Sequence, residues 1–176
     1  MHLHLLRQTT CLSIYYDSHN DWLYLDWEGE LMLSTVQEAC AELGACFLHR
    51  PYSRVLNSNL QVINVHWAVA AWLACEFMPH VKLAGIEHIA WICSPSLRGR
   101  NMVQTVMNLL PQLTVTLFDD MDEAVYSLQK LRPETTTGYI LPQRPATSQA
   151  RLAQVVQRLR QIAAAARPKM QRTSSF

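Results

Sequence analysis

The sequence predicts an α/β domain of alternating strands and helices, followed by a separate helix near the C-terminal end. Three observations support this fold class. Two strand-like runs come first, strand-like and helix-like patterns then alternate, and an arginine-rich amphipathic stretch comes last. The expected order, ββαβαβαβα, is typical of a sheet that is mostly parallel beyond an opening hairpin. We therefore expect a mixed sheet of four or five strands with helices on its faces, plus a C-terminal tail helix.

The first elements follow from local residue chemistry. Residues 12–16 and 22–27 are rich in β-branched and aromatic side chains, and the turn formers at 17–21 between them predict a β-hairpin. Ser34 and Thr35 each precede a Gln or Glu by three residues, as in a capping box, so a helix is expected from there to about residue 48.

The rest of the domain continues the alternation. The long apolar run 63–78 predicts a helix that stops at Pro79, because proline cannot donate a backbone hydrogen bond within a helix. The other expected elements are strands at 53–57, 86–93 and 113–118 and helices at 97–110 and 122–131.

Composition divides the chain into three parts. Residues 1–132 are the expected α/β domain, 133–148 a linker rich in proline and threonine, and 149–176 a basic amphipathic helix with a disordered end. The first part carries 8 Lys/Arg and 13 Asp/Glu, whereas residues 133–176 carry 7 Lys/Arg and 1 Glu, so the two should attract each other. We expect the tail's apolar stripe to dock on an acidic, partly apolar surface of its own core or of a second copy. That stripe includes Leu152, Val156 and Leu159.

Several classes of protein are disfavoured. Five cysteines without a C-x-x-C pair, each in an apolar run, indicate a reducing compartment, and we expect a cytoplasmic location. The start of the chain does not resemble a signal peptide, and the longest apolar run is shorter than the roughly 20 residues of a membrane span. No catalytic, phosphate-binding or metal-binding motif is present, so we expect no enzyme, cofactor or metal site. The tail helix lacks aromatic residues for base stacking, which argues against nucleic acid.

One candidate binding site is an anion site at the edge of the sheet. The loop after the strand 86–93 leads into a helix N-terminus, where free N–H groups favour anions. The loop at 57–59 should open on the same edge, where ligands of open α/β sheets bind. The alternative is an arginine-bearing helix cap in solvent. The expected ligand-binding residues are Asn57, Ser58, Asn59, Ser94, Ser96, Arg98 and Arg100.

The second candidate is the helix expected at 63–78, which has two apolar faces. Ile63 and Trp67 lie on one face, whereas Val65, Val69 and Trp72 lie on the opposite one. A helix that covers a sheet needs only one apolar stripe. The second face must be covered inside the chain, by a protein partner, or by a lipid or other apolar ligand.

Four segments together resemble a known family. They are the hairpin ending in Trp27-Glu28-Gly29, the strand 54–57 before a tryptophan-rich helix, the stretch 85–91, and the ending 118–124. These residues resemble the uncharacterised bacterial proteins of the STAS-like fold, the fold of anti-sigma-factor antagonists, over about residues 10–132. The resemblance implies a STAS-like α/β fold and a regulatory role without catalysis.

The sequence departs from the family at its phosphorylation motif. In well-studied members, a helix that begins with Asp-Ser-Ser-Gly follows the strand corresponding to 54–57, and a kinase phosphorylates a serine there. This chain has Asn57-Ser58-Asn59 instead, with Ser58 as the only nearby hydroxyl.

Two functions are consistent with these features. The first is a non-enzymatic regulatory or protein-interaction module that binds a protein partner or forms a homodimer. The alternative is a binding protein for a small anionic or apolar, lipid-like ligand, since a lipid-binding family shares the fold.

Overall fold

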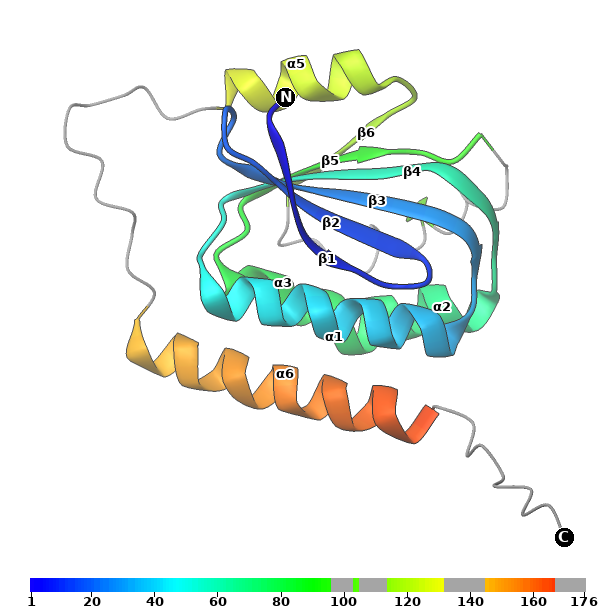
Figure 1. Ribbon diagram of the computed structural model, residues 1–176, viewed down its shortest axis with the longest axis vertical. Helices are drawn as coiled ribbons and strands as arrows, with labels where there is room; N and C mark the ends of the chain where they lie inside the picture. Colours follow the sequence, from blue (N-terminus) through cyan, green and yellow to red (C-terminus); the bar gives the residue numbers. More distant parts are fainter. Residues whose placement is uncertain (96–102, 105–113, 132–144, 167–176) are drawn as a thin grey trace, which may run out of the picture.

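A six-stranded mixed sheet forms the centre of the protein. The computed structural model describes residues 1–95, 103–104, 114–131 and 145–166, and the strands lie side by side in chain order (Figure 1). An antiparallel meander comes first, and the last three strands continue it in parallel. The strands are β1 (Leu3–Gln8), β2 (Leu12–Asp17), β3 (Trp22–Leu31), β4 (Arg54–Val65), β5 (His88–Ile92) and β6 (Thr114–Phe118).

The mixed sheet and the opening hairpin agree with the prediction, but the expected count of four or five strands and the expected order ββαβαβαβα were wrong, because three strands precede the first helix. The additional strand is β1, which pairs with β2 along the edge of the sheet. Leu3 and Leu5 of this strand are exposed, so no buried alternating face marks β1 in the sequence. Backbone pairing with β2 holds it in place, together with Leu6, whose partly buried side chain packs against the larger core.

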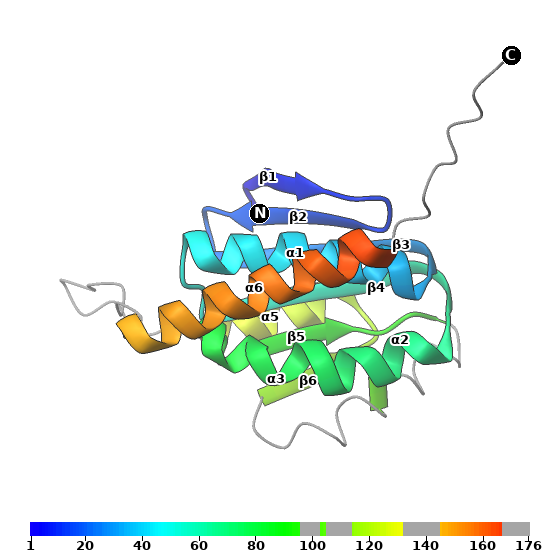
Figure 2. The same cartoon turned by 90° about the horizontal axis from the view of Figure 1, so that it is seen from below.

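The helices form layers on both faces of the sheet. One face carries α1 (Leu33–His49) and a helical stretch that starts with α2 (Trp67–Trp72), and α5 (Met121–Lys130) covers the other face (Figures 1 and 2). The tail helix α6 (Ala146–Ala166) lies outside α1 and α3. The side chain of Asp120 caps α5, because its Oδ1 accepts from the backbone N–H groups of Asp122 and Glu123.

The boundary between β4 and α2 differs from the prediction. Residues 63–65 belong to β4, and the helix begins at Trp67 rather than at Ile63. In the sheet, β4 pairs with β3 as far as Val65, and a register shift between Val62 and Asn64 leaves Ile63 without a partner on β3, so these residues follow strand pairing instead of rotating by 100° per residue. The expected second apolar face is consequently not a surface: Val65 and Val69 are buried in the core, and Trp72 packs against it.

The prediction that the helix ends at Pro79 was wrong. The helical stretch continues from α2 through a π-helical turn, η1 (Leu73–Phe77), into α3 (Met78–Val81) and the 3-10 turn η2 (Lys82–Ala84). A proline inside an α-helix lacks its N–H and clashes with the carbonyl four residues earlier, so the wider π turn before Pro79 relieves both problems. Gly85 then ends the stretch with a φ of 87°, a conformation that favours glycine.

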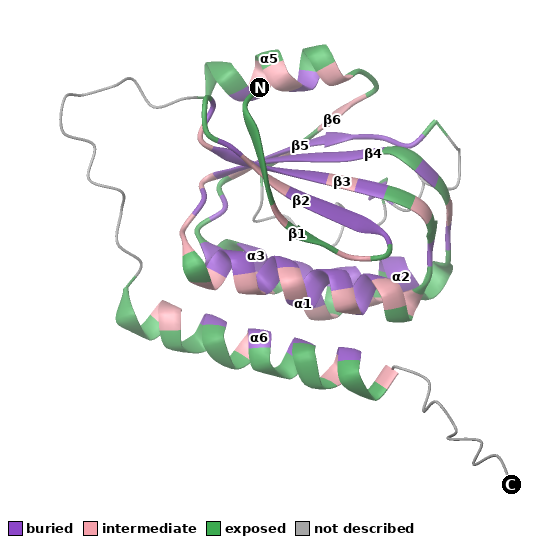
Figure 3. Cartoon of the chain, in the orientation of Figure 1, coloured by how far each residue is buried: buried purple, intermediate pink, exposed green. Residues whose placement is uncertain are grey.

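Two hydrophobic cores lie on the two faces of the sheet. The larger core is between the sheet and α1, α2 and α3, and the smaller is under α5 (Figure 3). Strand β3 serves both cores by alternation, since Leu23 and Leu25 face the larger core and Trp22 and Tyr24 the smaller.

The tail helix packs on its own chain. Its buried side chains are Leu152, Val156, Leu159 and Ala163, which point toward α1 and α3. Gly44 of α1 permits a close approach, because a Cβ built there would lie only 2.9 Å from Cγ2 of Val156. Gln149 Nε2 also donates to the carbonyl oxygen of Leu48, and Arg158 pairs with Glu76 at 3.0 Å. The helix begins at Ala146, earlier than the expected residue 149.

The helix expected at 97–110 lies almost entirely outside the described residues. Val103 and Gln104 are described within it; both are helical, and Val103 is fully buried in the larger core.

Candidate functional site

The polar run Asn57-Ser58-Asn59 lies inside β4. The prediction that it forms a loop at the sheet edge was wrong. Asn57 and Ser58 pair with Leu25 and Asp26 of β3 on one side and with β5 on the other. All three polar residues are buried. Polar residues remain in a central strand because their side chains find hydrogen-bond partners across the sheet.

The alternation of β4 separates these three residues onto two faces. Asn57 and Asn59 point toward the helices of the larger core, whereas Ser58 lies on the α5 side with Tyr24. Burial raises the pKa of Tyr24 to about 12, and the nearby Asp26 adds to the rise, although a hydrogen bond with Ser58 opposes it. Ser58 has an exposed fraction of 0%. A kinase cannot reach a hydroxyl in that position, so Ser58 cannot take the part of the serine that is phosphorylated in the proteins the sequence resembles.

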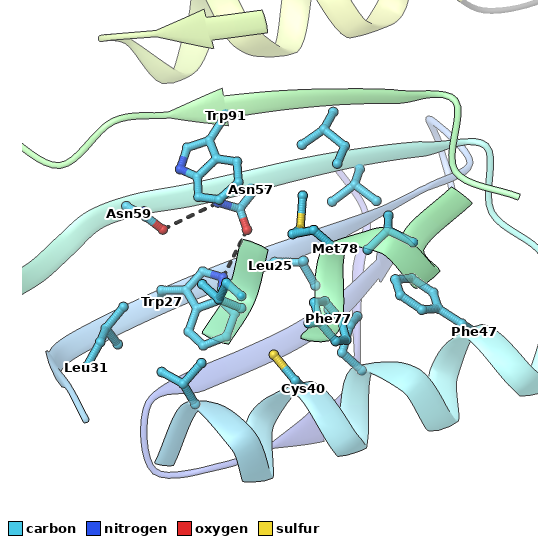
Figure 4. A pocket seen from close by; sticks show the side chains of 16 residues that line it. Leu25, Trp27, Leu31, Cys40, Phe47, Asn57, Asn59, Phe77, Met78 and Trp91 are labelled. Carbon is cyan, nitrogen blue, oxygen red and sulfur yellow. Dashed lines mark hydrogen bonds between the residues drawn. The ribbon is translucent and has the colours of Figure 1, made fainter. Parts of the chain in front are cut away.

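An apolar cavity lies between the sheet and the helices α1 and α3. Its volume is about 50 Å³, and carbon-rich side chains dominate its wall (Figure 4). The lining residues are Leu25, Trp27, Leu31, Val36, Cys40, Leu43, Phe47, Val55, Asn57, Asn59, Leu73, Phe77, Met78, Val81, Ile89 and Trp91. Burial raises the pKa of the Cys40 thiol well above its ordinary value, so this cysteine stays a neutral wall residue.

The two asparagines form the polar part of this wall. Trp27 Nε1 donates to Asn57 Oδ1 at 2.9 Å, and Asn59 lies next to Asn57 along β4 (Figure 4). Trp91 of β5 completes the group, since its indole points toward Asn59. Three adjacent strands therefore supply one small cluster of indole and carboxamide groups.

The π turn shapes the opposite wall. Leu73 and Phe77, its first and last residues, line the cavity together with Met78. A π turn rotates the residues after it relative to a regular helix, and such turns occur frequently at functional sites. The turn before Pro79 thus brings Phe77 and Met78 over the cavity.

The expected anion site is described only in part. Ser94 is fully buried, and its Oγ donates to the carbonyl oxygen of Val62 at 3.0 Å, so this hydroxyl links the segment after β5 to β4. Ser96, Arg98 and Arg100 lie outside the described residues. The anion site stays a prediction, and the buried residues 57–59 do not open on that edge.

Three large exposed apolar side chains come close together in the chain, from the end of β4 to the start of α2, and are called the strip below. Its members are Leu60, Ile63 and Trp67, with exposed fractions of 40%, 72% and 73%. Strand β3 lies next to this part of β4, and its Glu28 is the register partner of Gln61. The side chains of Glu28 and Glu30 are exposed. Figure 3 marks exposed positions along β3 and β4 where these strands bend toward α1 and α2.

The strip was missed in the sequence because the helix was expected to begin too early. With a helix from residue 63, Ile63 and Trp67 would have faced the sheet, and Val65 and Val69 would have been outside. The cavity was missed as well, although Asn57 and Asn59 occupy alternate positions of a strand flanked by tryptophan-bearing strands. That spacing was the one signal that could have revealed the polar wall.

Metal and membrane sites are not found in the described parts. Within residues 1–95, 103–104, 114–131 and 145–166, no cluster of His, Cys, Asp and Glu could hold a metal ion. None of the helices described has the length and hydrophobicity needed to cross a bilayer.

Comparisons with known proteins give matches among solved structures, and the two described below have low sequence identity. No protein-family model matches the chain, and no curated protein matches it in sequence. Among solved structures, an uncharacterised DUF3478-family protein with a SpoIIAA-like fold from Shewanella loihica PV-4 is 16% identical, with a TM-score of 0.45. That comparison covers 72% of this chain and 91% of the other.

A second solved structure is the anti-sigma factor antagonist SpoIIAA in its unphosphorylated form. It is 13% identical, with a TM-score of 0.49, and the comparison covers 68% of this chain and 96% of SpoIIAA. The protein itself is a mixed α/β protein with a six-stranded sheet. Neither likeness is close enough to carry a conclusion about the molecular role.

Proposed function

We propose that this chain is a non-enzymatic regulatory module that binds a protein partner through the strip Leu60, Ile63 and Trp67. The exposure of Ile63 and Trp67, 72% and 73%, is the observation that carries the proposal. Large apolar side chains that are grouped on a surface mark interaction sites, and tryptophan is enriched among the residues that dominate binding energy.

The charges beside the strip favour a basic partner. Glu28 and Glu30 are exposed on β3, next to the end of β4. A partner segment with apolar side chains flanked by lysine or arginine would bury the strip and place its charges near these carboxylates. Exposed ion pairs contribute only about 0–1 kcal/mol each, so apolar burial dominates affinity, and the charges set specificity and association rate.

Site-specific photo-crosslinking tests this function in the cells that make the protein. A photoreactive amino acid replaces Ile63 in one variant and Tyr126, an exposed aromatic residue on α5, in the control. We expect the probe at position 63 to link the chain to one protein that the probe at 126 does not capture. That protein is then purified and its binding to the chain is measured.

The affinity measurement decides the proposal. We expect Trp67→Ala to weaken binding of the purified partner about 30-fold, as for a central tryptophan of an interface, and Tyr126→Ala to leave binding unchanged. Glu28→Lys with Glu30→Lys should slow association and reduce its salt dependence. If the purified partner binds the Trp67→Ala and wild-type proteins equally, the strip is not the interface and the proposal is wrong.

A further inference from the structure

Strand β1 is an edge of the sheet, and among the described residues it pairs with β2 alone (Figure 2). The register between the two strands is regular from Leu3 to Leu5, and its one shift lies between Leu5 and Arg7. Natural edge strands are commonly protected by proline, lysine or a bulge, and residues 3–5 contain none of these. This part of β1 can therefore accept another strand.

The hydrogen bonds to β2 show which backbone groups of β1 point outward. Ser18 N–H donates to the carbonyl oxygen of His2 at 3.0 Å. Bonded residues alternate along an antiparallel strand, so the backbone groups of His2 and His4 face β2, whereas those of Leu3 and Leu5 face the open side. Each of these two leucines thus presents one N–H donor and one C=O acceptor to a strand that is added there.

The side chains of the same two leucines form an apolar patch beside this open edge. They lie on the α5 side of the sheet, because Leu5 is the register partner of Tyr15, which packs against the smaller core. Helix α5 packs on β4, β5 and β6, at the other end of the sheet, and Leu3 and Leu5 are 40% and 53% exposed. The edge therefore favours a strand that brings apolar side chains of its own.

The order of residues along β1 makes the edge complementary to itself. Leu3 and Leu5 flank His4 symmetrically, so a two-fold axis at His4 places Leu3 of each copy opposite Leu5 of the other. Each leucine then donates one backbone hydrogen bond and accepts one, and the leucines of both copies form one apolar cluster. Sliding one copy by two residues would instead place a leucine opposite Met1 or beside the charged Arg7.

We propose that the chain forms a two-fold dimer in which β1 pairs antiparallel with β1 of a second copy and continues the sheet across both molecules. The same patch is used on both copies, as in the commonest closed assemblies. One short strand on each side makes a small interface, and interfaces below about 1,200 Å² belong to weak, transient complexes. The dimer leaves the strip free, because β2 and β3 separate β1 from β4.

Sedimentation velocity of the full chain between about 10 μM and 1 mM tests the association, a range suited to a weak interface. We expect a monomer–dimer equilibrium for the wild type. Leu3→Lys with Leu5→Lys should raise the dissociation constant about tenfold or more, because lysines would lie directly opposite one another. Tyr126→Lys with Leu131→Lys makes the same change in charge at exposed residues on and just after α5, and should leave the constant unchanged.

Single cysteines test the register. Leu3→Cys, His4→Cys and Leu5→Cys are each made in a Cys75→Ser background, because Cys75 is the exposed native cysteine. We expect His4→Cys to form a covalent dimer about tenfold faster than the other two, since opposite residues whose backbone groups face away from each other have Cα atoms about 4.5 Å apart, within disulfide range. At positions 3 and 5, equivalent residues would be offset by two positions, roughly 7 Å along the strand.

Amide hydrogen exchange locates the contact without any substitution. The amides of Leu3 and Leu5 point outward in the monomer and should gain protection as the protein concentration rises. The amide of His4 faces β2 in each copy and is the internal control, because its bond does not depend on the dimer.

Four results would overturn the proposal. They are a wild-type chain that stays monomeric up to the highest concentration, equal dissociation constants for the wild type and the folded Leu3→Lys, Leu5→Lys variant, cross-linking no faster at position 4 than at positions 3 and 5, and exchange of the Leu3 and Leu5 amides that is independent of concentration. If the lysine variant fails to fold, exchange in the wild type and the rates of cross-linking still decide.

Discussion

Buried polar side chains explain why β4 can cross the centre of the sheet. Asn57 and Asn59 looked like loop residues in the sequence, because asparagine favours turns. The hydrogen-bond partner of Asn57 is Trp27 on β3, and that of Asn59 is Trp91 on β5. Both partners lie on other strands, far away along the chain. Local patterns contain no information about such partners, so only the folded sheet shows that these residues are buried.

Replacing Asn57 by leucine should destabilise the protein. The apolar side chain leaves the buried indole N–H of Trp27 without its acceptor, which costs about 1–3 kcal/mol of unfolding free energy. Urea denaturation followed by tryptophan fluorescence measures the change. Gln61→Leu, an exposed position on the same strand, is the control and should change the free energy by less than about 0.5 kcal/mol. Equal effects of both variants would contradict the role of Asn57.

Asp17 should make the stability of the β2–β3 hairpin depend on pH. Burial raises the pKa of Asp17, but hydrogen bonds from the Asn20 side chain and from nearby backbone N–H groups outweigh it, so the net pKa lies below its ordinary 3.8. Because the folded-state pKa is the lower one, the stabilisation is fully present above about pH 4 and is lost as the pH falls through the folded-state pKa.

The Asp17→Asn variant tests this linkage. It should be less stable than wild type at pH 7 by about 1–3 kcal/mol, because an amide nitrogen would face the donors that now bind the carboxylate. The difference should shrink below about pH 4, as the wild-type carboxylate becomes protonated. Asp122→Asn, at an exposed position, controls for the change in net charge. Parallel stability curves for wild type and Asp17→Asn across this pH range would show that Asp17 is not the group responsible.

At the level of elements, hydrophobic periodicity located most strands and helices but not their ends. The pattern at residues 63–78 was compatible with a helix throughout, and pairing with β3 converts its first three residues into strand. Likewise, proline normally ends a helix, but here a π turn lets the chain continue to Val81. Packing against the sheet decides both cases, because it stabilises conformations that local preference alone would not select.

The contact between α1 and α6 depends on the absence of a side chain at Gly44. Gly44→Leu should push α6 away, since even a Cβ would lie 2.9 Å from Val156 Cγ2, and we expect a loss of about 1–3 kcal/mol. Val156→Ala makes room for the new side chain. A double-mutant cycle should therefore give a coupling of at least about 0.5 kcal/mol between the two positions. Additive effects in the cycle would mean that residue 44 does not contact α6 in solution.

At the level of the whole molecule, the tail helix adds an outer layer to the larger core. The sequence predicted a tail helix with an apolar stripe, and the structure places Leu152 and Leu159 among the residues of that core. Its ion pair, Arg158 with Glu76, is largely exposed and contributes about 0–1 kcal/mol. Apolar burial, rather than the opposite charges of core and tail, therefore holds α6 in place.

Loss of that apolar contact should destabilise the whole domain. Leu152→Ala with Leu159→Ala should lower the unfolding free energy by several kcal/mol, since each buried Leu→Ala change costs about 2–5 kcal/mol. Gln154→Ala with Gln161→Ala changes the exposed face of the same helix and should have little effect. For both double variants, denaturation measures the unfolding free energy, and hydrogen exchange measures the protection of the amides in α1 and α3. If the leucine pair leaves exchange in α1 and α3 unchanged, α6 does not stabilise the core.

The sequence by itself determined the class of fold, the opening hairpin and the amphipathic nature of the tail. Those properties depend on residues close together in the chain, whose spacing of two or about 3.6 appears directly as a pattern. The tertiary structure alone decided that Ser58 is buried, that Ile63 and Trp67 are exposed, and that Asn57 faces an apolar cavity. Each of these depends on which strand or helix lies alongside, and residues distant in the chain make up that neighbourhood. The physical reason is that burial and hydrogen-bond partners are properties of the packed molecule, whereas periodicity is a property of the chain.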